Sequence, residues 1–295
     1  MHHFIGAIIN RPETLISNKR LLAGTTRPYE PFIDKYEKME TKNMDLKING
    51  KNAIITGGSR GVGRAIALGL AAEGVNVVVT ARKVSEELLK VVEEAKSMGV
   101  KAYPLGASMS NADDVGLMMK EAEALLGDLD ILINNAGIWL TGWIQDIPLS
   151  DWEETMDVNL TAPFLTSQYF AKVNLTKQRP GRIININSQA AFNGSTTGHA
   201  HYAASKAGMV ALTISMAREL SSKGITVNGV ALGVVDTDMI RNNIEANPGY
   251  YESRIPIGRV AQPEDVANIV VFMVSEPASY LTGTTIDATG GMLMR

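Results

Sequence analysis

Tyr202 and Lys206 stand four residues apart within residues 201–208, and Ser188 precedes Tyr202 by fourteen positions. Four-residue spacing on a helix places a phenol and an ammonium group on one face, one turn apart. The pKa of a free tyrosine is about 10, but a neighbouring cation favours the phenolate, which exchanges a proton with a hydroxyl or carbonyl group. This chemistry suits the interconversion of an alcohol and a carbonyl compound. Taken alone, such a pair is more often a solvated surface pair, so the rest of the chain has to decide.

A glycine-rich turn joins a short apolar strand to a helix near the start of the chain. The strand at 51–56 runs into Gly57, Gly61 and Gly63, and a second strand near 76–80 closes the unit. Glycines let the backbone approach a pyrophosphate, and the first amides of the helix point toward it. Glycine clusters also end strands for steric reasons alone, but here the strand and helix that the motif requires are both present.

Strands and helices alternate along the rest of the chain. Apolar runs such as 77–79 and 183–186 suit strands that are covered on both faces, as in a parallel sheet. The pattern predicts one α/β domain with a doubly wound, parallel, seven-stranded sheet and helices on both faces, so a ligand belongs at the carboxyl ends of the strands. The predicted strands lie near 52–56, 76–80, 101–105, 130–133, 181–187, 225–230 and 284–287, and the predicted helices near 60–73, 85–98, 111–126, 149–175, 201–222 and 263–275.

Composition limits the class of protein. The 295 residues are 45% hydrophobic, carry a formal net charge of −3 and include no cysteine. One domain of about 250 residues is an ordinary size. The absence of a basic block argues against nucleic acid or an anionic membrane as the main partner, and no apolar run approaches the roughly 18 residues of a spanning helix. Without cysteine, the chain has no disulfide, thiol catalysis or thiolate metal site.

Residues 1–43 differ from the rest of the chain. They contain three prolines and five acidic residues, show little periodicity, and include an apolar patch at 4–9 that is too short for a secretory signal. Residues 44–50 look like the usual beginning of an α/β domain. We therefore expect 1–43 to be a disordered or loosely docked extension, or a start assigned upstream of the real one, and 44–295 to form the domain.

Five separated motifs together resemble the short-chain dehydrogenase/reductase family, and they occur in that family's order and at its distances. They are the wide glycine spacing at Gly57, Gly61 and Gly63, the run Asn134, Asn135, Ala136 and Gly137, then Asn159, Ser188, and the pair Tyr202 and Lys206. The resemblance covers about residues 46–294 and is closest to 3-oxoacyl-[acyl-carrier-protein] reductases. It implies a Rossmann fold and an NAD(P)-dependent enzyme that acts on CH–OH donors.

The resemblance also implies roles at the reacting centre. Tyr202 would donate the proton in reduction and accept it in oxidation, while Lys206 would lower the pKa of Tyr202 and hold the nicotinamide ribose. Ser188 would hydrogen-bond the substrate oxygen, and Asn159 would organise a water-linked proton relay to the lysine. The chemistry needs no metal. The expected cofactor-binding residues are Gly57, Ser59, Arg60, Gly61, Val62, Gly63, Arg82, Ser108, Asn135, Ala136, Gly137, Tyr202, Lys206, Val235 and Thr237.

Charge favours NADP(H) over NAD(H). An acidic residue at the end of the second strand binds the ribose 2′-hydroxyl in NAD sites, whereas an arginine accommodates a 2′-phosphate. Residues 80–83 contain no carboxylate, and Arg82 stands there with Arg60 close by in the glycine turn. The alternative is that both arginines are solvated loop cations, which is easier to accept for Arg82 alone than for the pair.

The chain departs from the family pattern at two places. Ser108 stands near the position where relatives carry an aspartate that binds adenine, and its hydroxyl is expected to do so more weakly. Leu232 replaces a common proline, which makes the turn beneath the nicotinamide less rigid. Val235 and Thr237 still match the positions that contact the carboxamide and the pyrophosphate.

Three further features leave alternatives open. His199 and His201 have no third metal ligand at a plausible spacing, so we expect them to line the loop over the site. Trp139 and Trp143 form either an apolar wall for substrate or plain packing. Residues 239–257 have the composition of a mobile flap that closes over substrate.

The substrate is the least determined feature. Arg179 and Lys223 stand where bacterial 3-oxoacyl reductases carry cations that dock acidic acyl carrier protein, although such cations are also routine on surfaces. A 3-oxoacyl thioester is therefore one candidate, and a sugar or polyol, a steroid or another small ketone is the alternative. A non-catalytic dinucleotide-binding scaffold is the alternative of a different class.

We also expect a cytoplasmic homotetramer, because relatives assemble through the two long helices and the last strand. A monomer would leave part of the apolar surface of these helices in water. The residues concerned are Phe164, Leu165, Tyr169, Phe170, Met209, Leu212 and Met216.

Overall fold

Seven parallel strands form one sheet in the order β3-β2-β1-β4-β5-β6-β7 in the computed structural model, which describes residues 44–195 and 198–294. The predicted extension at 1–43 lies outside the described residues. The chain winds from β1 to one edge of the sheet and then from β4 to the other, so the strand order reverses between β1 and β4. The doubly wound prediction is confirmed. The strands are β1 Asn52–Ile55, β2 Asn76–Ala81, β3 Ala102–Gly106, β4 Ile131–Asn134, β5 Gly181–Ser188, β6 Ile225–Leu232 and β7 Thr285–Ala288.

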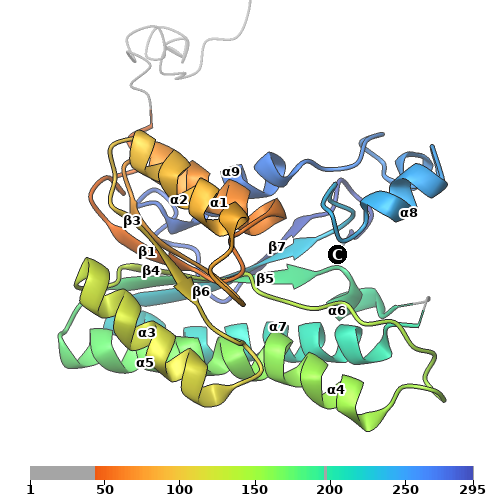
Figure 1. Ribbon diagram of the computed structural model, residues 1–295, viewed down its shortest axis with the longest axis horizontal. Coiled ribbons are helices and arrows are strands. Elements are labelled where there is room, and N and C mark those ends of the chain that lie inside the picture. The colour runs from red at the N-terminus through yellow and green to blue at the C-terminus, as the bar shows by residue number, and fades with distance from the viewer. Residues whose placement is uncertain (1–43, 196–197, 295) are drawn as a thin grey trace, which may run out of the picture. The chain divides into compact units, whose positions relative to one another are not determined.

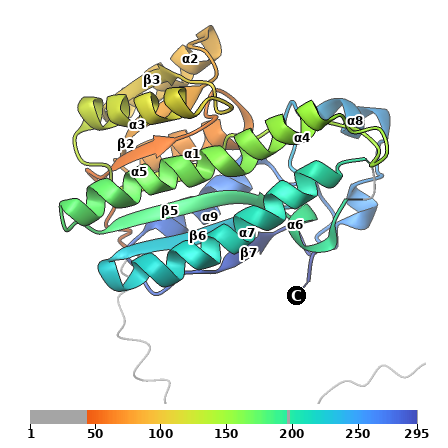
Figure 2. The ribbon, with the colours of Figure 1, turned by 90° about the horizontal axis from the view of Figure 1, so that it is seen from below.

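Helices cover both faces of the sheet. Helices α1, α2 and α9 form one layer, and α3, α5 and α7 form the other, with α4 leading into α5 (Figures 1 and 2). The short helices α6 and α8 lie near the carboxyl ends of the strands (Figure 1). The helices are α1 Gly61–Ala72, α2 Glu86–Ser97, α3 Ala112–Leu126, α4 Leu149–Met156, α5 Ala162–Thr176, α6 Ala190–Asn193, α7 Ala200–Leu220, α8 Arg241–Ala246 and α9 Pro263–Val274.

The apolar strands hold the two layers together because neighbouring side chains point to opposite faces. Ile55 of β1 enters the cluster that contains residues of α1 and α9, whereas Ile54 enters the cluster that contains residues of α3, α5 and α7. Both side chains are fully buried. Burial of each contributes about 1.5–3 kcal/mol, which explains why these strands need apolar residues at consecutive positions.

The predicted single helix at 149–175 is interrupted in the structure. Its middle, Asp157–Thr161, is a π-helical turn between α4 and α5. Such turns carry one extra residue and often occur at functional sites. Asn159 lies within this turn and is fully buried. Hydrophobic periodicity alone did not predict the interruption, because the helix axis continues through it.

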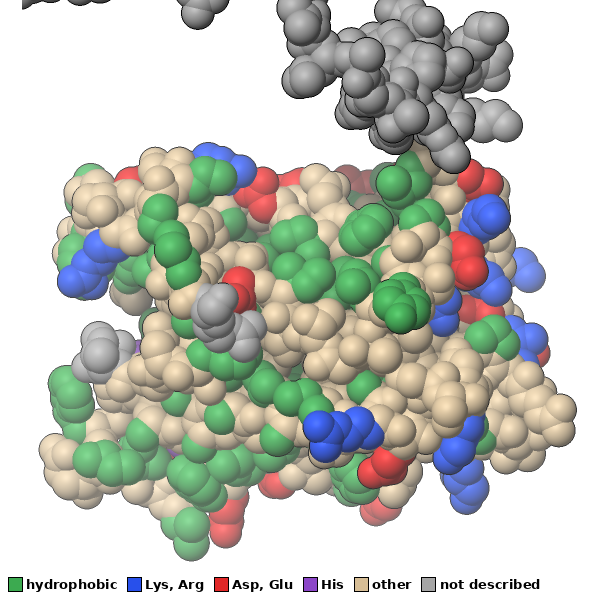
Figure 3. Space-filling model, turned by 180° about the vertical axis from the view of Figure 1, so that it is seen from behind, with side chains coloured by type: hydrophobic (Ala, Val, Ile, Leu, Met, Phe, Trp, Pro, Cys, Tyr) green, Lys and Arg blue, Asp and Glu red, His purple; other side chains and the backbone are tan. Residues whose placement is uncertain are grey.

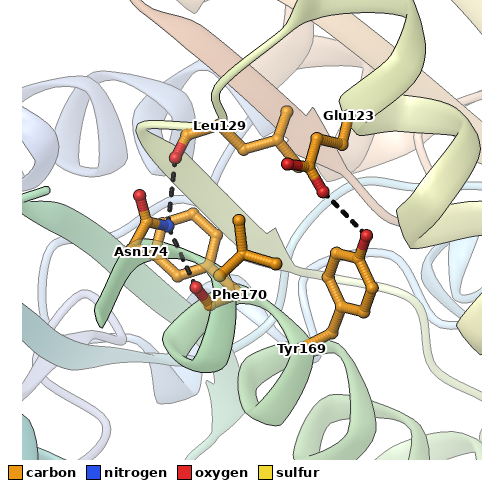
Figure 4. A pocket seen from close by; sticks show the side chains of 6 residues that line it. Glu123, Leu129, Tyr169, Phe170 and Asn174 are labelled. Atoms are coloured by element: carbon orange, nitrogen blue, oxygen red, sulfur yellow. Dashed lines mark hydrogen bonds between the residues drawn. The ribbon is translucent and has the colours of Figure 1, made fainter. Parts of the chain in front are cut away.

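Two of the apolar residues expected to face a partner subunit lie in the interior of this chain. Phe170 and Met209 are 1% and 0% exposed, so the expectation that a monomer leaves them in water is wrong. Tyr169 beside them donates its hydroxyl to Glu123 Oε2 at 2.7 Å across a small pocket between α3 and α5 (Figure 4). Phe164, by contrast, is 42% exposed.

Candidate active site

The glycine turn after β1 leaves no room for side chains. A Cβ atom on Gly63 would lie 2.2 Å from the Gly57 carbonyl oxygen and 2.4 Å from Asn135 Nδ2. Gly57 has a φ of 68°, and its Cβ would lie 2.8 Å from the Cα of Ala136. The amide of Asn135 donates to the carbonyls of Thr56 and Gly57, both at 2.9 Å. This turn and the loop after β4 are therefore packed backbone against backbone.

The beginning of α1 is open to an anion. Arg60 is the N-cap residue, and its side chain makes no capping bond. Val62 in the first turn is buried and anchors the helix, while Ser59 precedes it in the turn. A Cβ on Gly61 would lie 3.2 Å from Thr237 Cγ2, so the segment after β6 borders the same turn. Uncapped amides and a glycine turn fit a pyrophosphate.

Thr56 is a site residue that the sequence analysis missed. Its Oγ1 accepts hydrogen bonds from the backbone N–H groups of Asn135 and Ala136, both at 3.0 Å. It therefore fixes the loop after β4 against the glycine turn. Asn134 stabilises the sheet, because its Nδ2 donates to Asn185 Oδ1 on the neighbouring strand at 2.9 Å. A threonine at a strand end before a glycine run was the available signal for Thr56.

The structure brings together Ser188, Tyr202 and Lys206. Ser188 ends β5, Tyr202 lies in the first turn of α7, and the two side chains are hydrogen-bonded. Lys206 is 4% exposed, and its Nζ donates to the Ile186 carbonyl at 2.8 Å. The same Nζ lies 5.8 Å from the centroid of the Tyr202 ring. The predicted one-turn spacing thus places both groups at the carboxyl end of β5.

Burial, rather than the lysine, sets the direction of the tyrosine pKa in the structure. Burial raises the pKa of Tyr202, and its hydrogen bond with Ser188 opposes this shift. The expected lowering of this pKa by Lys206 is not what the protein's own side chains produce. Burial also lowers the pKa of Lys206 to about 8. A tyrosine that keeps its proton at neutral pH is suited to donating it to a carbonyl oxygen.

Asn159 links the loop after β4 to the helix that carries the tyrosine. Its Oδ1 accepts from the Ile138 N–H at 2.9 Å, and its Nδ2 donates to the Ile138 carbonyl at 3.0 Å. Its Nδ2 also donates to Ser205 Oγ at 3.2 Å. A Cβ on Gly137 would lie 3.2 Å from Asn159 Oδ1 and 3.7 Å from Lys206 Nζ. Ser205, which the sequence analysis did not single out, completes this link.

The two candidate phosphate-binding arginines lie at the ends of neighbouring strands. Arg82 is exposed and directly follows β2, and the Gly58 N–H donates to the Thr80 carbonyl at 2.8 Å, which ties the glycine turn to the same strand end. The Arg60 side chain is 75% exposed and lies 3.7 Å from Asp238. Both guanidinium groups are therefore accessible at this edge.

The remaining predicted cofactor residues lie around the same edge of the sheet. Ser108 follows β3, and its N–H donates to Asp114 Oδ2 at 3.3 Å. Val235 is buried and pairs with Ala261 in an isolated bridge. The Leu232 carbonyl at the end of β6 accepts from the Gln189 N–H at 2.9 Å, so a backbone bond supports this turn where relatives carry proline.

His199 and His201 are 4% and 0% exposed, and His201 has no hydrogen-bond partner among the described residues. Burial lowers the pKa of His201. No group of three or more His, Cys, Asp or Glu side chains in residues 44–195 and 198–294 could hold a metal ion. In the same ranges no helix is both long and apolar enough to cross a membrane.

The cations considered for carrier-protein docking lie away from the site. The Arg179 side chain forms ion pairs with Asp128 at 3.1 Å and with Asp130 at 3.0 Å. Its charge is therefore largely balanced within the chain. Lys223 lies in a short 3₁₀ turn after α7.

Known proteins resemble nearly all of the described chain. The family model described as short chain dehydrogenase matches residues 51–248. A 3-oxoacyl-[acyl-carrier-protein] reductase FabG from Aquifex aeolicus is 41% identical over 250 residues, which are 84% of this chain and 100% of that protein. A reductase of the same name from Staphylococcus aureus is 42% identical over 244 residues, covering 83% of this chain and 98% of the relative.

Solved structures agree with these sequence relatives. A blue fluorescent protein from a metagenomic library, in complex with NADPH, has a TM-score of 0.78 at 34% identity and covers 84% of this chain and 99% of its own. A short chain dehydrogenase from Burkholderia cenocepacia, in complex with NADP, has a TM-score of 0.77 at 35% identity and covers 83% of this chain and 98% of its own.

Proposed function

The chain belongs to the short-chain dehydrogenase family, and we propose that it is an NADP(H)-dependent enzyme that interconverts a carbonyl compound and a secondary alcohol. The observation that carries this proposal is the meeting of Ser188, Tyr202 and Lys206 beside the glycine turn. When bound, the cofactor supplies the hydride. The chain supplies the proton and holds the reacting oxygen.

Each side chain has a role in the proposed reaction. Tyr202 donates its phenolic proton to the substrate oxygen during reduction. Ser188 hydrogen-bonds the same oxygen and stabilises the negative charge that develops there. Lys206, whose Nζ donates to the Ile186 carbonyl in the structure, would hold the nicotinamide ribose. Asn159 holds the Ile138 backbone and belongs to the proton relay that serves the lysine.

The cofactor-binding part of the proposal rests on the shape of the glycine turn. The amides at the start of α1 and the cradle of Gly57, Gly61 and Gly63 suit the pyrophosphate, with Thr237 on its other side. Arg60 and Arg82 are placed to bind a 2′-phosphate, which would favour NADP(H) over NAD(H). Titration of both cofactors by fluorescence tests this preference, and Arg82→Asp should shift it toward NAD(H).

A 3-oxoacyl thioester is the proposed substrate class. Its support is the name of the relatives, 3-oxoacyl-[acyl-carrier-protein] reductase, at 41% and 42% identity. Acyl carrier protein as the partner has weaker support, because Arg179 is already paired with two aspartates and only Lys223 would remain for docking. Sugars, steroids and other small ketones remain the alternative substrates.

Assembly into a homotetramer is part of the same proposal. The two long helices expected at a subunit interface each expose an apolar side chain, Phe164 on α5 and Ile214 on α7. Figure 3 shows one face of the molecule, on which hydrophobic side chains are interspersed with polar ones. Exposed apolar patches on soluble proteins often mark such interfaces. Light scattering on the full chain and on a chain that begins at Met44 would test both the tetramer and the need for residues 1–43. A cytoplasmic location stays a prediction, which cell fractionation would check.

Oxidation of NADPH with a panel of carbonyl compounds tests the proposed activity. The panel contains a 3-oxoacyl thioester, a quinone, a ketosteroid and a keto sugar, and the Tyr202→Phe variant serves as the control. We expect turnover with the thioester that the control loses. NADPH binding without turnover of any of these compounds would instead support the non-catalytic scaffold.

A further inference from the structure

The two tryptophans after β4 have different surroundings. Trp143 is 60% exposed, and its backbone carbonyl closes a turn by accepting from Asp146 and Ile147. Trp139 is only partly exposed, and its ring stacks on His199 with centroids 4.2 Å apart and planes tilted by 31°. The ring contact with His199 therefore holds the indole of Trp139 in a defined orientation, whereas Trp143 makes no such ring contact within residues 44–195 and 198–294.

Several further contacts hold the loop of Trp139 against the beginning of α7. His199 Nδ1 lies 2.9 Å from the Leu140 carbonyl, and because a carbonyl only accepts, Nδ1 carries the proton. The Gly142 N–H donates to the Gly198 carbonyl at 2.8 Å. Gly198 has a φ of 75°, and a Cβ there would lie 3.1 Å from the Gly142 oxygen. The loop and the residues before α7 thus form a two-stranded contact.

The other end of the loop is fixed at the reacting centre. Asn159 holds both backbone groups of Ile138, the residue directly before Trp139. Asn159 also bonds Ser205, whose hydroxyl donates to the Tyr202 carbonyl at 2.7 Å. Trp139 therefore lies between two attachments to the helix that carries the proton donor.

The direction of α7 shows on which side of the phenol this pair lies. Lys206 reaches back to Ile186, and Tyr202 reaches Ser188 at the end of β5. The helix therefore runs opposite to β5, and His199 lies farther out than Tyr202 beyond the end of the strand. Lys206 is one turn after the tyrosine on the cofactor side, so His199 and Trp139 lie on the side left for substrate.

We propose that Trp139, held flat by His199, is the wall against which the apolar group on the substrate's carbonyl carbon packs. This inference rests on the proposed carbonyl chemistry and names the substrate class that the site selects. The site prefers carbonyl compounds with a flat or bulky apolar substituent over those with a methyl group. Trp139 and His199 are thus specificity-determining residues, and Trp143 is not.

Two 3-oxo esters that differ only in this substituent test the proposal. Ethyl benzoylacetate carries a phenyl group where ethyl acetoacetate carries a methyl group. We expect Trp139→Ala to lower kcat/KM for the phenyl ester about tenfold more than for the methyl ester, mainly through KM, because it removes contact area for the ring. Trp143→Ala, the matched control in the same loop, should leave the ratio unchanged. An equal loss for both esters with Trp139→Ala would overturn the proposal.

Two histidine variants separate the stacking from the hydrogen bond. His199→Phe keeps an aromatic ring under Trp139 but loses the bond to Leu140, whereas His199→Ala loses both. We expect the phenyl-to-methyl ratio to survive in His199→Phe and to fall severalfold in His199→Ala. If both variants changed kcat alone, and equally for the two esters, His199 would have only a structural role.

A binding measurement tests whether the substrate packs against Trp139 even if the protein shows no reductase activity. The chain has three tryptophans, so Trp143→Phe combined with Trp152→Phe leaves Trp139 as the sole indole emitter. In this variant with NADP⁺, ethyl benzoylacetate should quench the emission in a saturable way, and ethyl acetoacetate should do so far less. Saturable quenching by the phenyl ester would support the wall even if the unmutated protein reduced neither ester, whereas failure of the phenyl ester to quench would refute the wall.

Discussion

We call the side of the sheet where the parallel strands begin its amino edge, and the side where they end its carboxyl edge. The polar groups of these two sides are paired differently. At the amino edge, Asp130 before β4 pairs with Lys51 at 3.4 Å and with Arg179 at 3.0 Å, and it also accepts from the Asn52 N–H at 2.9 Å. At the carboxyl edge, α1 begins without a side-chain cap. Asn187 near the end of β5 is 2% exposed, and neither of its amide atoms has a partner among the described residues.

This contrast separates stability from function within one fold. A buried polar group without a partner costs about 1–3 kcal/mol, whereas a satisfied one costs little. The amino edge pairs the buried carboxylate of Asp130 within the chain, although the Nε atoms of Arg179 and Arg182 have no hydrogen-bond partner among the described residues. The carboxyl edge keeps amides, cations and a buried lysine available, as expected where a protein sacrifices stability for a site.

The largest expected effect is at the carboxyl edge. Tyr202→Phe removes the proton donor and leaves the ring, so turnover should fall by roughly 10²–10⁴-fold while NADPH binding stays nearly unchanged. Steady-state kinetics and a fluorescence titration check the two parts. Near-normal turnover in this variant would mean that another group supplies the proton.

Lys206→Met should stabilise the protein while it abolishes activity. The pKa of Lys206 falls from 10.5 to about 8 on folding, so the buried charge is a cost that is fully present below pH 8 and disappears as the pH rises toward 10.5. The variant also loses the hydrogen bond to the Ile186 carbonyl. After allowance for this loss, we expect the free energy of unfolding to rise by about 2 kcal/mol at pH 7. Urea unfolding at pH 7 and pH 10 checks this sign. A gain that did not shrink at the higher pH would contradict it.

Two glycine substitutions compare the cofactor turn with an ordinary helix. Gly63→Ala places a methyl group 2.2 Å from the Gly57 oxygen, so we expect weaker NADPH binding and a loss of roughly 1–3 kcal/mol in unfolding free energy. Gly116 in α3 has no atom within 4 Å of its Cβ position, so Gly116→Ala should be neutral or stabilise by about 0.5–1 kcal/mol. Thermal unfolding of both variants measures the difference between their changes in stability. Equal losses of stability in the two variants would contradict the steric explanation.

The smallest expected effect is at the amino edge. Arg179→Ala leaves Asp130, which is 8% exposed, with Lys51 as its remaining ion-pair partner in the described chain. Because the Arg179 side chain is 34% exposed, solvent screens its ion pair with Asp130. We therefore expect the free energy of unfolding to fall by about 1 kcal/mol. The KM for NADPH should stay unchanged. A change in KM would show that the two edges are coupled.

The sequence predicted the strands well because most of them are rich in apolar residues and lie between glycines and polar turns. All seven strand predictions agree with the structure to within about two residues. The closeness of Tyr202 and Lys206 was also predicted, since their spacing on a helix fixes their relative position. Local sequence patterns were sufficient for features that lie within a single helix or strand.

The remaining features depend on contacts between elements. Thr56 accepts from the backbone of Asn135, and Ser205 accepts from the side chain of Asn159, and both partners lie far away in sequence. Burial of Phe170 and the direction of the Tyr202 pKa both depend on how α7, α5 and the sheet enclose them. Hydrophobic periodicity shows that a helix has an apolar side, but it does not show which other element covers that side.

The π-helical turn Asp157–Thr161 also restricts the length of the chain. Because a π-helical turn holds one residue more than an α-helical turn, deletion of one residue here would restore a continuous α-helix and leave α5 nearly in phase with α4. Asn159 would then move out of the position in which it bonds the Ile138 backbone. The extra residue is therefore needed for the site rather than for the packing of the two helices. Among natural relatives with the same site, we therefore expect this stretch to vary in residue type but to keep its length.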